Sequence, residues 1–224
     1  MKVRKAYLDI EATYVGPIKI EEDRNGFFKD YKNWTFFCEK EHNGNKVQYR
    51  GIIGVLVADF DFEESTNVYK LVNSKFVQLV GEEITKERLM KELEGMTEII
   101  GYHCRTRPNW KGYTGYDYGV VGAQLGIILD ELPGVRSTDL ELLAHGANMY
   151  GGLKVVEEKV PTVPKRKSGV ESGEEEEKIL LEIGSCCDEN KKEELWKKAL
   201  MYNREDVVNL VYIEQYLKKF KIVE

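Results

Sequence analysis

Apolar and polar residues alternate with the short period of β-strands over much of the N-terminal half. The first such run is VRKAYLDIEAT at 3–13, which predicts a first strand. VQYRGIIGVLVADF at 47–60 predicts a long central strand, and NVYKLV at 67–72 predicts a short outer one. The segment 23–46 contains Asn-Gly twice with aromatic residues between, which is typical of a hairpin or strand extension.

Beyond residue 80 the apolar positions recur mostly at helical spacing. The pattern predicts a helix at 81–96, a buried strand at 97–103, a helix at 116–129, a short strand at 133–138 and a helix at 140–145. This order favours an α/β fold with a mixed β-sheet, in which antiparallel N-terminal strands are followed by parallel ones and helices flank the sheet.

The C-terminal third is more polar. Residues 153–160 predict a short amphipathic helix or turn, and 161–177 combine Pro, Gly, Ser and charge runs that are typical of a loop. Residues 189–220 are strongly helical, and we expect two helices that meet near Tyr202. A chain of 224 residues suits a single domain over 1–224, with insertions at 23–46, 104–115 and 161–177.

Composition narrows the class of protein. Hydrophobic residues make up 42% of the chain, enough for a core, and no apolar run reaches the ~18 residues of a membrane span. We therefore expect a soluble, cytoplasmic protein that does not engage a membrane, with its four cysteines as free thiols. A net charge of −6 excludes a globally basic nucleic-acid binder, although local clusters of charge remain informative.

Two acidic residues lie on one face of the first predicted strand. Asp9 and Glu11 are two positions apart, so both side chains project the same way. Buried charges without partners are costly, which leaves a metal cation, an Arg or Lys partner, or exposure at the strand end as ways to satisfy them. Further along the chain, Asp117 opens a predicted helix, and Tyr202 and Asp206 share one helical face at i and i+4.

Taken together in this order, these residues resemble a known family. Asp9-Ile10-Glu11, then Tyr116-Asp117, then YNREDV at 202–207 are similar to the three motifs of the DEDD-type 3′–5′ exonucleases of the ribonuclease H-like superfamily. GGLKVVEEKV at 151–160 and YNREDV look like segments of its YprB-like branch, in the tyrosine subclass. The resemblance covers nearly the whole chain and implies a ribonuclease H-like fold.

The resemblance also implies a chemistry. Asp9, Glu11, Asp117 and Asp206 would hold two divalent ions, Mg²⁺ or Mn²⁺, about 3.5–4 Å apart. Asp9 would bridge the ions, Glu11 and Asp206 would hold the water-activating ion, and Asp117 would hold the leaving-group ion. Tyr202 would orient the attacking water rather than act as a free base, because an unperturbed phenol has a pKa of about 10.

The approach to the second motif departs from the family pattern. Asp117 follows His103 only after an inserted loop at 104–115, which makes Asp130 and Asp139 fallback candidates for the third carboxylate. The inserted loop combines cations with aromatic rings, a composition that suits either a single-stranded nucleic-acid path or an ordinary surface loop. Its candidate substrate-binding residues are Arg105, Arg107, Trp110, Lys111 and Tyr113.

Other charged residues receive plainer interpretations. We interpret the basic run 165–167 as solvated, with phosphate contacts as the alternative, and the acidic run Glu174–Glu177 as solvated. His103 and His145 are given no metal.

The leading hypothesis is a metal-dependent 3′–5′ exonuclease acting on single-stranded ends of DNA or RNA. A structure-selective endonuclease of the same superfamily and a non-catalytic nucleic-acid-binding module are the alternatives. The sequence identifies no protein partner.

Overall fold

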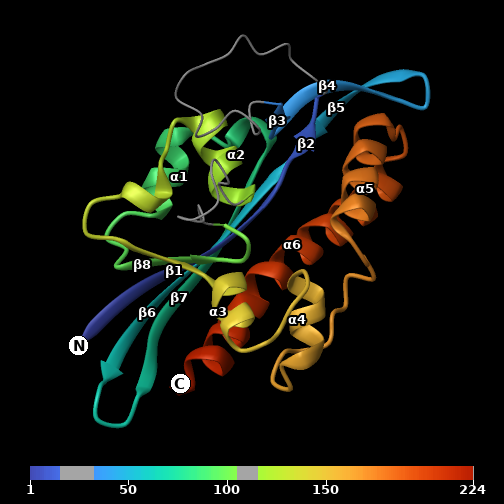
Figure 1. Cartoon of the computed structure of the whole chain (residues 1–224). Coiled ribbons are helices and arrows are strands. Elements are labelled where there is room, and N and C mark those ends of the chain that lie inside the picture. The colour runs from blue at the N-terminus through green and yellow to red at the C-terminus, as the bar shows by residue number, and fades with distance from the viewer. Residues whose placement is uncertain (16–32, 105–115, 224) are drawn as a thin grey trace.

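A six-stranded mixed sheet forms the centre of the molecule (Figure 1). The computed structural model describes residues 1–15, 33–104 and 116–223. The strand order is β10-β7-β6-β1-β8-β9. β1, β6 and β7 pair antiparallel, whereas β8 and β9 extend the sheet in parallel from β1. The predicted α/β class, with an antiparallel start and a parallel continuation, is confirmed. The strands span Lys2–Glu11 (β1), Ile52–Glu63 (β6), Val68–Val80 (β7), Glu98–Gly101 (β8), Arg136–Asp139 (β9) and Lys221–Val223 (β10).

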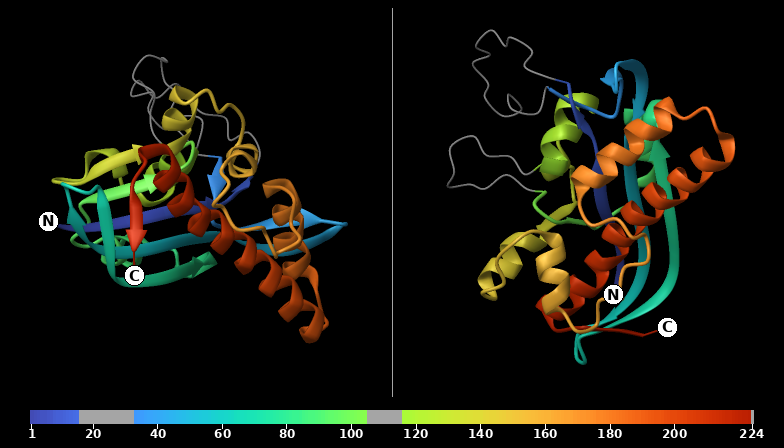
Figure 2. Two further views of the ribbon diagram at one scale, coloured as in Figure 1. Left: turned by 90° about the horizontal axis from the view of Figure 1, so that it is seen from below. Right: turned by 90° about the vertical axis from the view of Figure 1, so that its right-hand side faces the viewer.

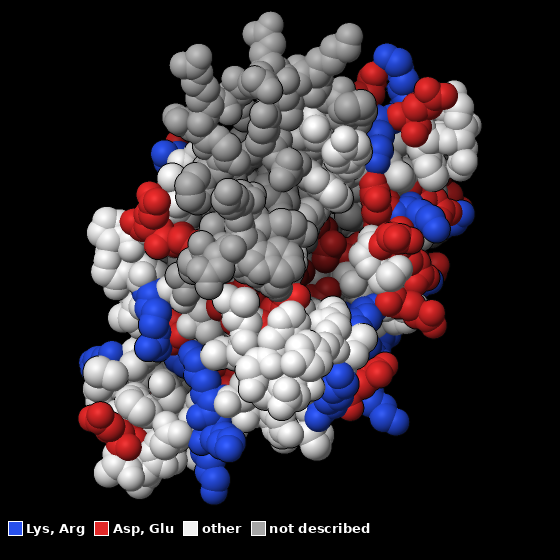
Figure 3. All heavy atoms as spheres, in the orientation of Figure 1, with Lys and Arg blue, Asp and Glu red and all other residues white. Residues whose placement is uncertain are grey.

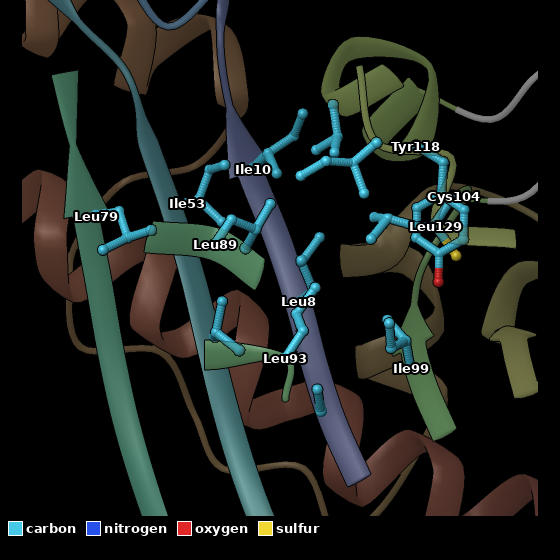
Figure 4. Close-up of a cluster of buried hydrophobic side chains, with 14 of the residues drawn as sticks. Leu8, Ile10, Ile53, Leu79, Leu89, Leu93, Ile99, Cys104, Tyr118 and Leu129 are labelled. Carbon is cyan, nitrogen blue, oxygen red and sulfur yellow. The ribbon is translucent and has the colours of Figure 1, made fainter. Parts of the chain in front are cut away.

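Helices cover both faces of this sheet. On one face, Leu8 and Ile10 of β1 belong to a core with Leu89 of α1 and Val120 of α2 (Figure 4). On the other face, α3, α4 and α6 contribute to a second core, and α6 lies across the sheet (Figure 2). None of the described helices is long and apolar enough to cross a membrane. The helices span Lys86–Glu92 (α1), Tyr116–Leu125 (α2), Leu140–Gly146 (α3), Leu153–Lys159 (α4), Gly173–Ser185 (α5) and Glu189–Lys218 (α6), with short 3₁₀ turns at Gly81–Glu83 (η1) and Leu129–Glu131 (η2).

Alternate side chains of β1 project to opposite faces of the sheet, apolar ones toward α1 and α2 and mostly polar ones toward α6. Leu8 and Ile10 enter the core beneath α1 and α2. The intervening residues project toward α6, because Tyr7 donates a hydrogen bond to Glu214 and Asp9 accepts one from Asn203, and both partners lie on α6. The two acidic residues of the first motif therefore face the C-terminal helix, as the shared-face prediction requires.

A hairpin projects beyond the central sheet. β4 (Phe37–His42) and β5 (Asn45–Arg50) are joined at the second predicted Asn-Gly turn, where Asn43 and Gly44 have φ of 51° and 76°. Positive φ at both positions is what a tight two-residue turn demands. The first Asn-Gly pair lies outside the described residues. A small ladder of β2 (Thr13–Tyr14) and β3 (Trp34–Thr35) lies nearby.

The predicted strand 47–60 is in fact two strands that break at Gly51. A Cβ at Gly51 would lie 2.3 Å from the carbonyl oxygen of Glu11, so the close approach of β1 requires glycine there. Both halves remain extended, but β5 pairs with β4 whereas β6 pairs with β1.

Several predicted lengths and boundaries were wrong. β7 runs to Val80 rather than ending at residue 72, and α6 is one unbroken helix of 30 residues rather than two. The loop predicted at 161–177 ends earlier, because α5 begins at Gly173 with Ser172 as its cap. β10, which pairs in parallel with β7, was not predicted. The assignment of one domain with three insertions stays a prediction.

Candidate metal centre

Two segments nearly two hundred residues apart bring three carboxylates together. Asp9 and Glu11 come from the end of β1, and Asp206 comes from the middle of α6. One oxygen of each residue lies within 4.8 Å of the others. Clustered carboxylate oxygens are the ligands that hard divalent cations prefer, so this triad can hold a metal ion. Figure 3 shows acidic side chains at the bottom of a hollow near the middle of one face.

Burial disfavours the ionised form of each carboxyl group in the triad. Burial above all, then the neighbouring charge of Glu11, raises the pKa of Asp9 well above its ordinary value. Burial likewise raises the pKa of Asp206 to about 6, although the adjacent Arg166 opposes the shift. The like charges of neighbouring carboxylates also oppose ionisation of Asp9, and a bound cation would relieve this repulsion.

Asp117 adjoins this triad without belonging to the group within 4.8 Å. It lies in the first turn of α2, is 4% exposed, and its Oδ2 has no hydrogen-bond partner among the described residues. Burial, Asp139 and Asp206 all raise its pKa. A buried oxygen without a donor beside other acids fits a cation ligand.

The two fallback aspartates have other positions. Asp139 caps α3, and its Oδ1 accepts hydrogen bonds from the backbone nitrogens of His103 at 3.0 Å and Glu141 at 2.9 Å. Asp130 lies in the short 3₁₀ turn η2, on the partly exposed surface. Asp117 is therefore the better candidate for the third carboxylate.

Tyr202 lies one helical turn before Asp206 and is 5% exposed. Two cations approach its ring, with Lys154 Nζ at 4.7 Å and Arg166 Cζ at 5.2 Å from the centroid. Burial and the charge of Asp206 raise the pKa of the phenol well above its ordinary value. The hydroxyl is therefore protonated at neutral pH.

Arg166 corrects the interpretation of 165–167 as a solvated basic run. Its side chain is only 16% exposed, while Lys165 and Lys167 remain exposed. The guanidinium binds both oxygens of Glu157, at 2.8 and 2.6 Å, and also pairs with Asp206. Its remaining nitrogen, Nη1, is buried and has no acceptor in the described part of the chain.

Glu176 corrects the interpretation of Glu174–Glu177 as a solvated run. It is 0% exposed, and after burial itself the charge of Glu176 is the strongest influence that raises the pKa of Glu11. Glu177 also has a partner, since it accepts a hydrogen bond from Lys40 at 2.6 Å. The signal that sequence reasoning missed is helical spacing, because Glu176 shares the apolar face of α5 with Leu180 and Ile183 at i+4 and i+7.

Asn203 is a second residue that sequence reasoning missed. Its Nδ2 donates to Asp9 Oδ2 at 3.1 Å, and its Oδ1 accepts from Gln78 Nε2 at 3.0 Å. Space for this amide comes from Gly54, where a Cβ would lie 2.3 Å from Asn203 Oδ1. Asn203 therefore fixes the orientation of Asp9 relative to α6.

The remaining candidates do not extend the centre. His103 and His145 both approach Glu141, with His103 Nδ1 at 2.7 Å and His145 Nε2 at 3.8 Å, so their contacts lie with α3. The candidate substrate-binding residues of the inserted loop lie outside the described residues: Arg105, Arg107, Trp110, Lys111 and Tyr113. Their role stays a prediction.

Comparisons of the chain with protein-family models, with curated proteins and with solved structures found no match.

Proposed function

We propose that this chain is a metal-dependent 3′–5′ exonuclease that hydrolyses phosphodiester bonds at single-stranded nucleic-acid ends. The observation that carries the proposal is the meeting of Asp9 and Glu11 with Asp206, with Tyr202 one turn away on the same helix. A sheet that begins antiparallel, continues in parallel and carries helices on both faces is compatible with the ribonuclease H-like fold that the motifs resemble.

The donor set suits two divalent ions, Mg²⁺ or Mn²⁺. Asp9, Glu11 and Asp206 would hold one, and Asp117, with its unpartnered buried oxygen, would join Asp9 in holding the other. A pair of such ions, when bound, supplies positive charge that acidifies water and neutralises a phosphodiester. All of these ligands are oxygen atoms, which favours hard cations over zinc or copper.

The protein's own groups then position the reactants. Asn203 holds Asp9 in one orientation, so that the carboxylate needs little rearrangement when a ligand arrives. Tyr202 keeps its proton and lies beside the carboxylates, which suits it to orient a water by hydrogen bonding rather than to accept a proton from it.

Cations lie beside the centre, where a phosphate backbone would approach it. Arg166 is largely buried and already pairs with Glu157, although its Nη1 has no acceptor among the described residues. Arg166 and Lys154 line a groove of about 450 Å³ that also includes the exposed Lys165 and the acidic Glu157 and Glu158. Lys154 and Lys165 are the groups of this groove that suit contact with a polyanionic substrate.

The proposal is tested with a 3′-labelled single-stranded oligonucleotide, as DNA and as RNA, in the presence of Mn²⁺ or Mg²⁺. We expect Asp9→Ala and Asp206→Ala to abolish cleavage while the circular dichroism spectrum is retained. Tyr202→Phe should lower the rate and leave metal binding nearly unchanged. Asp61→Ala, on the exposed far end of β6, is the matched control and should cleave normally.

The outcomes separate the alternatives. Undiminished cleavage by both Asp9→Ala and Asp206→Ala contradicts the assigned centre. Cleavage of an oligonucleotide whose 3′ end is blocked identifies an endonuclease instead. Metal-independent oligonucleotide binding without any cleavage identifies a non-catalytic binding module.

A further inference from the structure

Glu176 occupies an unusual position for a glutamate in a charged run. It lies in the first turn of α5 and is 0% exposed, and no basic or amide group among the described residues donates to its oxygens, whose hydrogen-bonding neighbour is the carboxyl group of Glu11. Leu180 and Ile183, on the same helical face, pack into a core with Leu195 of α6. This packing holds the start of α5 against the acidic centre.

The surroundings of Glu176 lack a matching cation. Its carboxyl neighbour is Glu11, the charges of Asp206 and Asp9 also act on it, and Lys154 opposes them with a positive charge. That ammonium is already hydrogen-bonded to the carbonyl oxygen of Val170 at 2.9 Å. A buried carboxylate without a cation destabilises a fold by several kcal/mol, whereas an apolar side chain in the same place would stabilise it by packing. The stability of the fold therefore does not explain why this residue is acidic.

The next residue in the run shows the contrast. Glu177 forms an ion pair with Lys40 at 2.6 Å and also accepts a hydrogen bond from Thr13, and these contacts lower its pKa. Two adjacent glutamates on one helix thus differ both in exposure, 0% for Glu176 against 34% for the side chain of Glu177, and in their partners. One has a cation from the protein, and the other faces a cluster that is able to bind a cation from solution.

We propose that Glu176 is a fifth metal-ligating carboxylate, which joins Glu11 on one ion and so makes α5 part of the metal centre. This inference rests on the proposed metal-dependent function. It assigns the site a ligand that the three sequence motifs do not contain, and it adds a contact through the bound ion to the apolar packing that places α5.

The test measures Mn²⁺ binding directly, by the electron paramagnetic resonance signal of free Mn²⁺, and thermal unfolding with and without Mn²⁺. Glu176→Gln should weaken binding of one ion by about 10- to 100-fold, a range typical for loss of a group that supports a metal site. The rise in unfolding temperature produced by Mn²⁺ should shrink accordingly. Glu174→Gln changes an exposed glutamate in the same helical turn and should leave both measurements unchanged.

Three further results decide the case. If Glu176→Gln binds Mn²⁺ as the unaltered protein does, while Asp9→Asn loses binding, the inference fails and the proposed metal centre stands. If Asp9→Asn also binds normally, the metal centre itself is wrong. If Glu176→Gln fails to fold, Glu176→Leu replaces it, because leucine extends the apolar face of α5. We expect Glu176→Leu to fold and, without metal, to unfold at a higher temperature than the unaltered protein. Its Mn²⁺ binding should be as weak as that expected for Glu176→Gln.

Discussion

Two clusters of charged residues lie between β1 and α6, and they are built on opposite plans. At one end, Lys5 and Tyr7 of β1 meet Glu214 of α6, with Lys5 Nζ at 2.8 Å and the Tyr7 hydroxyl at 2.7 Å from its oxygens. At the other end, Asp9 and Glu11 meet Asp206 of the same helix. The strand alternation is the same in both places, so the difference lies in the chemistry of the partners.

The Lys5 cluster is balanced within the protein. Burial opposes ionisation of Glu98, but hydrogen bonds from Arg136 and Thr138 and the charges of Lys218 and Lys5 outweigh it and lower the pKa to about 2. Lys218 Nζ also bridges Glu98 at 2.9 Å and Glu214 at 2.8 Å. Each acid has a cation, and the cluster fastens α6 to the sheet.

The acidic centre lacks this balance. Its carboxylates have raised pKa values where Glu98 has a lowered one, and Arg166 is the cation that directly pairs with Asp206 in the described part of the chain. Buried charge that the fold satisfies by itself stabilises the fold. Buried charge that the fold leaves unsatisfied lowers stability and is a feature of candidate ligand-binding sites.

The largest expected contrast is in the free energy of unfolding without metal. Glu214→Gln leaves the ammonium of Lys5, which is 1% exposed, without its closest acid, and we expect a loss of about 3–5 kcal/mol. Asp9→Asn removes one of several repelling charges without breaking an ion pair among the described residues, and it should leave stability unchanged or increased. Urea unfolding of both variants measures the difference. If both variants lost the same free energy of unfolding, the proposed difference between the two clusters would be wrong.

The pH dependence of stability should also differ in sign. Glu98 has a pKa lowered to about 2, so its contribution is present above about pH 4.5 and is lost as the pH falls toward 2; it amounts to roughly 3 kcal/mol. Asp9 has a raised pKa, so its contribution is present at acidic pH and is lost as the pH rises through that pKa.

Thermal unfolding of metal-free protein between pH 3 and pH 8 tests both signs. Asp9→Asn should unfold at a higher temperature than the unaltered protein at pH 7 and at a similar temperature at pH 4. Added Mn²⁺ should remove the difference at pH 7. A gain in stability that persisted unchanged at pH 4 would show that charge at Asp9 is not its cause.

A smaller effect is expected where the acidic centre meets the sheet. Gly54→Ala places a Cβ against Asn203 and Val207, which should destabilise the fold by about 1–3 kcal/mol and displace the amide that orients Asp9. Mn²⁺ affinity should fall together with stability. Gly146→Ala has nothing within 4 Å of the new carbon and serves as the control. If Gly54→Ala kept full Mn²⁺ affinity, Asn203 would not be a positioning residue.

Much of this architecture could be predicted because it depends on short-range periodicity. Alternation along β1 placed Asp9 and Glu11 on one face, and the i, i+4 spacing placed Tyr202 beside Asp206. The antiparallel start of the sheet and its parallel continuation followed from the change from successive strands to strands that alternate with helices, whereas the order of the strands was not predicted. The metal identity, the second ion and the nucleolytic activity were reached through resemblance, and they stay predictions.

The parts that could not be predicted depend on long-range packing. Glu176 reads as one glutamate among four until the core under α5 shows which of them faces inward. Arg166 reads as surface charge until Glu157 and Asp206 are brought next to it. No sequence pattern predicts the role of Asn203, because its hydrogen-bond partners Asp9 and Gln78 lie on two different strands.

The unbroken course of α6 has a mechanical consequence. One rigid rod of 30 residues carries Leu195 in the core under α5, then Tyr202 and Asp206, then Glu214 and Lys218 in the Lys5 cluster. When α6 rotates about its axis, all of its residues rotate together. The ion pairs of Glu214 and Lys218 near its end therefore fix the direction in which Asp206 faces β1. A single residue inserted between Asp206 and Glu214 would turn one end relative to the other by about 100°, so that the two clusters could not both form.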